Sequence, residues 1–220
     1  MSFDTAIVAR SLPLLAQGAA TTILLVAAAL VIGSVLGVVA CFGRMLRRGL
    51  FFWLCSTYVY VMRGIPEMLV MFWIYYCAPL VLDMRLSPVA SAITAMSLYS
   101  GAALAEIFRA GIDAVPRGQT EAARALGIPE LRIWAEIIVP QAFRITIPAI
   151  LGVVTLVVKV SGLASTLSVG ELVYQATIIS GQSYRYFEMF TAVGIFYLII
   201  IYPLSFMAQT YEHRLSRRTQ

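Results

Sequence analysis

The sequence predicts an all-α, polytopic membrane protein with five transmembrane helices. Of its 220 residues, 60% are hydrophobic and only 12% are charged, which is about half the charged share of a soluble domain. Several apolar runs approach the roughly 20 residues that a helix needs to cross the hydrocarbon core. Runs such as 24–31 and 195–201 lack the alternation of a barrel strand, and backbone groups in lipid must be paired within helices or closed barrels. We therefore predict helices throughout.

The apolar runs place the spans, in order, at about 18–42, 64–82, 88–109, 145–167 and 188–209, within one membrane domain covering 1–220. Segment 51–62 is aromatic and apolar but lies between arginines, so we expect an interfacial or tilted helix leading into the second span. Trp53 and Tyr58 would then lie at headgroup depth. Small residues at Gly33 and Gly37 of the first span and at Gly101 of the third predict close helix packing.

Basic residues predict the orientation, because loops on the cytoplasmic side carry an excess of lysine and arginine. With five spans, Arg10, Arg85 and Arg185 fall on one side, and Lys159 lies within a span. The other side receives Arg44, Arg47, Arg48, Arg63, Arg109, Arg117, Arg124, Arg132, Arg144, Arg214, Arg217 and Arg218. This asymmetry puts the N-terminus outside, the C-terminus in the cytoplasm, and residues 110–144 in a cytoplasmic loop.

Composition excludes other classes of protein. The net charge of +5 comes from cations beside apolar runs, without the basic stripe and stacking aromatics of a nucleic-acid interface. Cys41, Cys55 and Cys77 are odd in number and lack metal-ligand spacing, so we expect small buried apolar residues and no metal site. The sole histidine, His213, lies in the basic tail and no acid–base cluster converges, which argues against a membrane enzyme with catalytic residues.

The 110–144 loop has strong helix signals. A turn at 116–118 precedes Thr120, a plausible N-cap, and alanines that favour a helix follow. Gly127 can adopt the left-handed conformation that ends a helix. Pro129 suits the first turn of a second helix, which we expect Pro140 to end.

The same loop carries a motif. Glu121-Ala122-Ala123, Gly127 and Ile137-Ile138-Val139-Pro140 have the spacing of the "EAA" loop and resemble that loop in ABC importer permeases. The segments 63–66, 105–112 and 159–163, together with Glu171-Leu172, resemble the branch of that family that imports polar amino acids. The sequence departs from this branch at Ile65, Glu67, Ala103 and Val160. The alternative for the loop is a helical hairpin that merely links two spans.

The resemblance implies a type I ABC importer transmembrane domain, the permease subunit for polar amino acids or opines in the bacterial inner membrane. It implies two copies of an ATPase subunit that hold ATP and Mg²⁺, a second permease copy or a homologous permease, and a periplasmic or extracellular solute-binding protein, with lipid around the spans. It also assigns contacts with the ATPase to Gly118, Gln119, Glu121, Ala122, Ala123, Leu126, Gly127 and Ile128. The sequence lacks a Gly-x-x-x-x-Gly-Lys-Ser/Thr loop, so we expect this chain to bind no cofactor and to hydrolyse no ATP itself.

Charged residues near the spans are candidates for the substrate pathway: Lys159, Ser161, Ser165, Glu106 and Glu67. Lys159 is fifteen residues beyond Arg144, about 22 Å along a helix, where a charge is costly unless it is paired or faces water. It either reaches outward to Glu171 or lipid headgroups, or faces a cavity with Ser161 and Ser165 and attracts an amino acid's α-carboxylate.

Glu106 and Arg109 are three residues apart and are expected to form an intrahelical ion pair, with a gating role ranked second. Arg63 reads as a cytoplasmic anchor in preference to a substrate contact. An alternative function is an ion-coupled secondary amino acid transporter that uses Lys159 and Glu106. Such a transporter would need inverted repeats or broken helices in paired positions, and neither is clear in the sequence.

Overall fold

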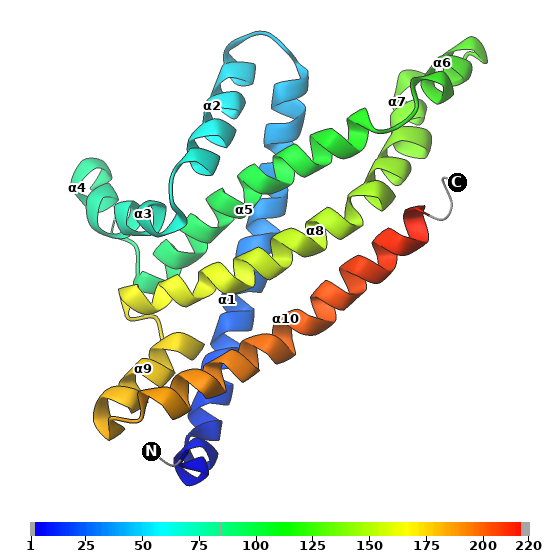
Figure 1. Ribbon diagram of the computed structural model, residues 1–220. Helices are drawn as coiled ribbons and strands as arrows, with labels where there is room; N and C mark the ends of the chain where they lie inside the picture. The colour runs from blue at the N-terminus through cyan, green and yellow to red at the C-terminus, as the bar shows by residue number, and fades with distance from the viewer. Residues whose placement is uncertain (1–2, 84, 217–220) are drawn as a thin grey trace.

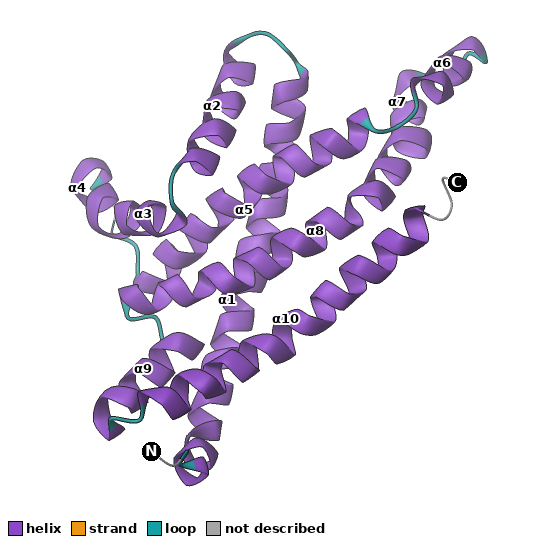
Figure 2. Cartoon of the chain, viewed as in Figure 1, coloured by secondary structure: helices purple, strands orange, loops and turns teal. Residues whose placement is uncertain are grey.

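The computed structural model describes residues 3–83 and 85–216, and in that part of the chain every regular element is a helix (Figures 1 and 2). Arg217 and Arg218, which are among the arginines predicted on the cytoplasmic side, lie outside the described residues. The elements are α1 (Thr5–Met45), α2 (Leu50–Gly64), α3 (Glu67–Phe72), η1 (Trp73–Cys77), α4 (Ala78–Leu82), α5 (Pro88–Asp113), α6 (Arg117–Ala125), α7 (Glu130–Arg132), η2 (Ile133–Ile138), α8 (Val139–Ser161), η3 (Gly162–Leu167), α9 (Leu172–Ser183) and α10 (Tyr186–Ser216).

Four helical segments are each long and apolar enough to cross a membrane: Thr5–Met45, Pro88–Asp113, Glu130–Leu167 and Tyr186–Glu212. A fifth crossing arises if the bent pair Leu50–Gly64 and Glu67–Leu82 counts as one span. In Figure 1 the turn after α1, the α6 region and the end of α10 lie toward one end of the bundle. The N-terminus and α9 lie toward the other end, as alternating spans require.

The second span differs from the predicted continuous helix at 64–82. Its two arms meet at an angle of 112°, because Pro66 favours extended backbone in the residue before it, and Ile65 has φ −105° and ψ 137°. The first arm, α2, packs against α1 and α5. Tyr58 lies in that contact and donates a hydrogen bond to the carbonyl oxygen of Leu98 at 2.7 Å. Segment 51–62 is therefore packed in the bundle, and this hydrogen bond ties Tyr58 to α5.

Helices α1 and α5 form the centre of the bundle, and small residues let them approach closely. A Cβ added to Gly33 would lie 2.1 Å from the Ser100 hydroxyl, and one added to Gly37 would lie 2.9 Å from Leu104 Cβ. The Ser100 hydroxyl also donates to the Ala29 carbonyl across the interface at 3.4 Å. The small-residue packing predicted from sequence is confirmed at these positions.

Pro140 does not end a helix, contrary to the prediction. It occupies the first turn of α8, directly after the π-helical turn η2. A wide π turn relieves the clash and the missing N–H that proline brings to a regular α-helix. As a result, one helical segment runs from Glu130 through η2, α8 and η3 to Leu167.

At the opposite end of the bundle, Glu171 joins α9 to α1. Its carboxylate is buried, caps α9 by accepting from the Tyr174 amide at 2.8 Å, and accepts from the Thr22 hydroxyl at 3.4 Å. The Leu172 amide donates to the Thr22 hydroxyl oxygen at 3.2 Å. Glu171 is therefore engaged with Thr22 and the start of α9, and no ion pair between it and Lys159 occurs among the described residues.

Candidate functional site

The 110–144 loop folds as a short helix, a sharp bend and a second helix. Helix α6 starts at Arg117, earlier than predicted, and the Thr120 hydroxyl bonds back to the Arg117 carbonyl at 2.7 Å, so Thr120 is not the cap. Gly127 has φ +73°, the left-handed conformation predicted from sequence. The amides of Gly127 and Ile128 donate to the carbonyls of Arg124 and Ala123 at 2.9 and 3.1 Å, the two-bond pattern that ends many helices at a glycine.

The loop has a small hydrophobic core of its own. Val115, Ala123, Ile133, Ile138 and Ala142 are buried against one another. These residues come from the turn after α5, from α6, from η2 and from α8, and Ile112 of α5 packs against them, so the cluster fixes α6 against both neighbouring spans. A hydrogen bond of 2.6 Å between the side chains of Gln141 and Gln119 adds a polar tie between α8 and α6. The loop is therefore held as a rigid arm.

The arm also contacts the first span. The rings of Trp134 and Phe42 lie 6.2 Å apart between centroids, at a tilt of 53°. Phe42 is in the last turns of α1, and Trp134 belongs to η2, which leads directly into α8. A displacement of α6 would thus reach α1, α5 and α8 together through packed side chains.

Most residues assigned to the ATPase contact lie on the outer surface of the arm. Glu121, Ala122 and Gly127 are exposed, as are Gly118 and Gln119, and Ile128 is partly buried. Leu126 is 79% exposed, which is unusual for a leucine at a packed site. Ala123 differs, because it is only 3% exposed and packs inside the loop's core, beneath the exposed face.

Leu131 is the exposed residue that the sequence reasoning missed. It is 82% exposed and lies in α7, just past the bend at Gly127. Leu131 is not a position of the EAA motif. A leucine close to the helix start at Pro129, in an otherwise polar loop, was nevertheless visible in the sequence as a candidate contact residue. Leu126 and Leu131 together present aliphatic surface that the chain itself leaves uncovered.

A second feature is a cavity of about 490 Å³ at the bend between α2 and α3. Ligand pockets for small molecules span roughly 300–1,000 Å³. We call this cavity the chamber, and it is lined by Arg63, Gly64, Ile65, Pro66, Glu67, Tyr99, Ala103 and Leu156.

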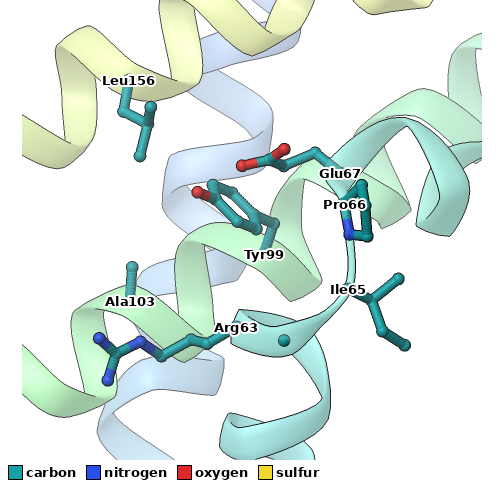
Figure 3. Close-up of a pocket in the computed structure, with 8 residues that line it drawn as sticks. Arg63, Ile65, Pro66, Glu67, Tyr99, Ala103 and Leu156 are labelled. Atoms are coloured by element: carbon teal, nitrogen blue, oxygen red, sulfur yellow. The ribbon is translucent and has the colours of Figure 1, made fainter.

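The chamber carries opposite charges on the two arms of the bend. Arg63 comes from the last turn of α2 and Glu67 from the first turn of α3. In Figure 3 the Tyr99 ring lies between the Glu67 carboxylate and the Arg63 guanidinium, and the Tyr99 hydroxyl points toward Glu67. Leu156 of α8 projects toward the chamber from the opposite side (Figure 3).

Arg63, which we predicted to be a cytoplasmic anchor, borders the chamber. It is thirteen residues beyond Leu50, where α2 starts, or about 20 Å along the helix. The sequence showed only that arginine preceded a Gly-Ile-Pro turn. It did not show that α2 packs against α1 and α5, which brings Arg63 to Glu106 and to the chamber.

The other residues predicted for the substrate pathway lie in different places. Glu67 lines the chamber. Lys159 is exposed and lies three residues after Leu156, on the same side of α8. Ser161 is buried and donates to the Val158 carbonyl at 2.7 Å, while Ser165 donates to the Gly162 carbonyl at 2.7 Å. The structure thus does not bring Lys159, Ser161 and Ser165 together around one cavity.

Glu106 lies beside the chamber at the centre of an ion cluster. One oxygen, Oε1, is 2.8 Å from Arg44 and 3.3 Å from Arg63, and Oε2 is 3.2 Å from Arg109. The predicted Glu106–Arg109 pair is confirmed. Arg44 and Arg63 come from α1 and α2, so the cluster joins three helices, and sequence spacing could reveal only the pair within α5.

Among the described residues, no group of three or more His, Cys, Asp or Glu side chains has an arrangement that could hold a metal ion. The polar groups of the chamber are instead a cation, an anion and a phenol, which suit a small charged or zwitterionic solute.

The chain is similar to named transport permeases over almost its whole length. The arginine transport system permease protein ArtQ of Bacillus subtilis (strain 168) is 30% identical over 98% of both chains. The L-cystine transport system permease protein TcyB of the same organism is 33% identical over 93% of this chain and 88% of its own. The glutamine transport system permease protein GlnP of Escherichia coli (strain K12) is 31% identical over 98% of this chain and 99% of its own.

Solved structures of ABC transporters have the same fold as this chain. A crystal structure of an amino acid ABC transporter with histidines superposes with a TM-score of 0.88 at 30% identity, over 97% of this chain and all of that chain. An inward-facing structure of the MetNI methionine ABC transporter has a TM-score of 0.74 at 20% identity and shares the fold. The binding-protein-dependent transport system inner membrane component family matches residues 29–217. The chain is therefore a multi-pass permease of the binding-protein-dependent transport system inner membrane component family.

Proposed function

We propose that this chain is the permease subunit of an ATP-driven importer of polar amino acids, working with separate ATPase subunits, a second permease and an external solute-binding protein. The observation that supports this most directly is the rigid 110–144 arm, which presents Glu121, Leu126 and Leu131 outward while its own core ties it to three spans. A surface of this kind receives a partner and passes on its movement. The relatives named for arginine, glutamine and cystine support amino acids as the class of substrate.

In this proposal the orientation is the one that the arginines predict, with the arm in the cytoplasm. ATP and Mg²⁺ bind to the two ATPase subunits. Closure of those subunits moves α6, and the packed contacts of Val115, Ile133 and Trp134 carry the displacement into α5, α8 and α1. Because the spans move as rigid helices, access to the chamber alternates between the two sides of the membrane.

The chamber is the proposed substrate site in each permease. Arg63 would bind the α-carboxylate of an amino acid, since a guanidinium suits a carboxylate in a bidentate geometry. Glu67 would bind the α-ammonium group, and Tyr99 lies between the two in Figure 3. Lys159, exposed one turn beyond Leu156 on α8, would attract the carboxylate toward the chamber.

The test is uptake by the complete importer in proteoliposomes, with ATP inside and each of the twenty proteinogenic amino acids offered with the binding protein outside. We expect ATP-dependent uptake of at least one polar amino acid, lost together with ATPase co-purification in Glu121→Lys and Gly127→Pro. Glu136→Lys makes the same charge change at another exposed position of the loop and should retain both. Uptake by the permease alone, driven by an ion gradient, would instead establish the secondary transporter.

A further inference from the structure

The Glu106 cluster holds its three arginines unequally. Arg44 is only 10% exposed and lies 2.8 Å from Glu106 Oε1. Arg109 has a second acidic partner, Asp113, at 2.8 Å. Arg63 is 56% exposed and lies 3.3 Å from the oxygen that it shares with Arg44. Of the three, Arg63 is therefore the cation held most loosely, because exposed ion pairs contribute little.

Arg63 is also the member of the cluster that lines the chamber. The side chain that borders the space where a solute would bind is thus already paired, through its guanidinium, with a protein carboxylate, Glu106. A guanidinium carries five N–H donors in a planar fork that fits one carboxylate in two bonds. A second carboxylate that approaches from the chamber competes with Glu106 for this fork.

We propose that Glu106 is a positioning residue that occupies Arg63 while the chamber is empty and yields it to the α-carboxylate of the arriving amino acid. Glu106 is not stranded by this exchange, because Arg44 and Arg109 remain within ion-pair distance of it. The inference rests on the proposed function, since it takes the chamber as the amino acid site. It adds that Glu106 competes with the substrate for Arg63 and thereby lowers the affinity of the chamber for the amino acid.

The exchange also has a mechanical consequence. The pair between Arg63 and Glu106 ties the end of α2 to α5, directly before the 112° bend. When substrate takes Arg63, this tie is released at the hinge between α2 and α3. Binding of substrate in the chamber thereby allows the second span to move. A solute without a carboxylate would leave the Arg63–Glu106 pair intact.

The experiment measures equilibrium binding to the permease–ATPase complex in nanodiscs, without the external binding protein. The probe is the amino acid that the wild-type complex imports from the panel of twenty, compared with its α-carboxamide. In Glu106→Gln we expect the dissociation constant of the amino acid to fall roughly two- to fivefold, the range of a partly exposed ion pair. The constant for the α-carboxamide should stay unchanged.

Two variants separate exchange at Arg63 from a general effect of charge. In the Arg63→Gln background, Glu106→Gln should no longer strengthen binding, because the contested cation is absent. Asp113→Asn removes one negative charge from the same helix, next to Arg109 rather than Arg63, and should leave the dissociation constant unchanged. A gain that persists without Arg63, an equal gain for the α-carboxamide, or no gain in Glu106→Gln would overturn the exchange.

The outcomes distinguish the two proposals. If the wild-type complex imports none of the twenty amino acids, the proposed function fails and the exchange falls with it. If import occurs but the Glu106→Gln signature is missing, the exchange alone is wrong. Should Glu106→Gln fail to assemble, Arg63→Gln decides the matter: the exchange requires it to abolish the preference for carboxylate over carboxamide, and a retained preference refutes it.

Discussion

Leu156 projects from α8 toward the chamber and faces Tyr99 and Glu67 across it (Figure 3). Leu156→Trp adds a bulky ring to a cavity of about 490 Å³, so we expect uptake of the imported amino acid to fall at least tenfold. Basal ATP hydrolysis and assembly should remain, because the arm is untouched. Leu198→Trp is the matched control on the exposed surface of α10. Uptake equal to wild type in Leu156→Trp would remove the chamber from the pathway.

Residue-level prediction succeeded where chemistry is local and failed where it depends on distant partners. The left-handed Gly127 follows from the flexibility of glycine, and the Glu106–Arg109 pair follows from helical spacing. The contacts of Glu106 with Arg44 and Arg63 span 62 and 43 residues of sequence. No local pattern encodes such contacts, because packing of α1 and α2 on α5 creates them.

Glu171 gives the joint between α9 and α1 a dependence on pH. Burial of the carboxyl group raises the pKa of Glu171 to about 7, and the amide and hydroxyl donors only partly offset this effect. Because the folded state holds the proton more tightly than the unfolded chain, the free energy of unfolding is highest below the ordinary pKa and falls as the pH rises toward 7.

Replacing this carboxyl group by an amide should remove the effect. In Glu171→Gln, the melting temperature in detergent should become less sensitive to pH between 5 and 8, by an amount equivalent to at most about 3 kcal/mol. Thermal unfolding at several pH values measures this sensitivity. Glu188→Gln is the comparison, as a second buried glutamate at the same end. A pH profile that is identical in wild type and Glu171→Gln would contradict the assignment.

At the scale of elements, the residues that stabilise the arm differ from those that we expect to contact the ATPase. Ile133 is fully buried in the loop's core, so Ile133→Ala should destabilise the arm by about 2–5 kcal/mol. Hydrogen exchange measured by mass spectrometry should show faster exchange in 117–138. Leu131→Ala removes an exposed side chain and should leave exchange unchanged while weakening ATPase co-purification. The prediction fails if the two variants show the same pattern.

Sequence reasoning found the arm's two helices and its bend, since glycine and proline mark such boundaries locally. It placed the end of the second helix wrongly at Pro140, because the π turn of η2 accommodates this proline. It also did not predict that Ala123 is buried, because the core of the loop forms only when η2 folds back against α6. The break in the second span was signalled by Gly64 and Pro66, but its angle depends on how α2 and α3 pack against α5.

At the scale of the whole molecule, two exposed helix surfaces differ in character. The exposed surface of α10 carries Leu198, Ile199 and Tyr202, side chains that suit lipid. The exposed surface of α8 carries Ala149, Gly152, Leu156 and Lys159, which combine small residues with a charge. A lysine in hydrocarbon is costly, so the α8 surface is the one that a second permease and a water-filled pathway would cover.

Thiol labelling distinguishes these two environments, because a charged thiosulfonate reagent reacts only where water reaches the thiolate. In a background with Cys41, Cys55 and Cys77 replaced, Lys159→Cys in the assembled transporter should react, and Leu198→Cys should not. Amino acid substrate should slow the reaction at 159, since Lys159 lies one turn from Leu156 of the chamber. If position 159 is as inert as position 198, the α8 surface faces lipid, and the pathway must lie elsewhere in the assembly.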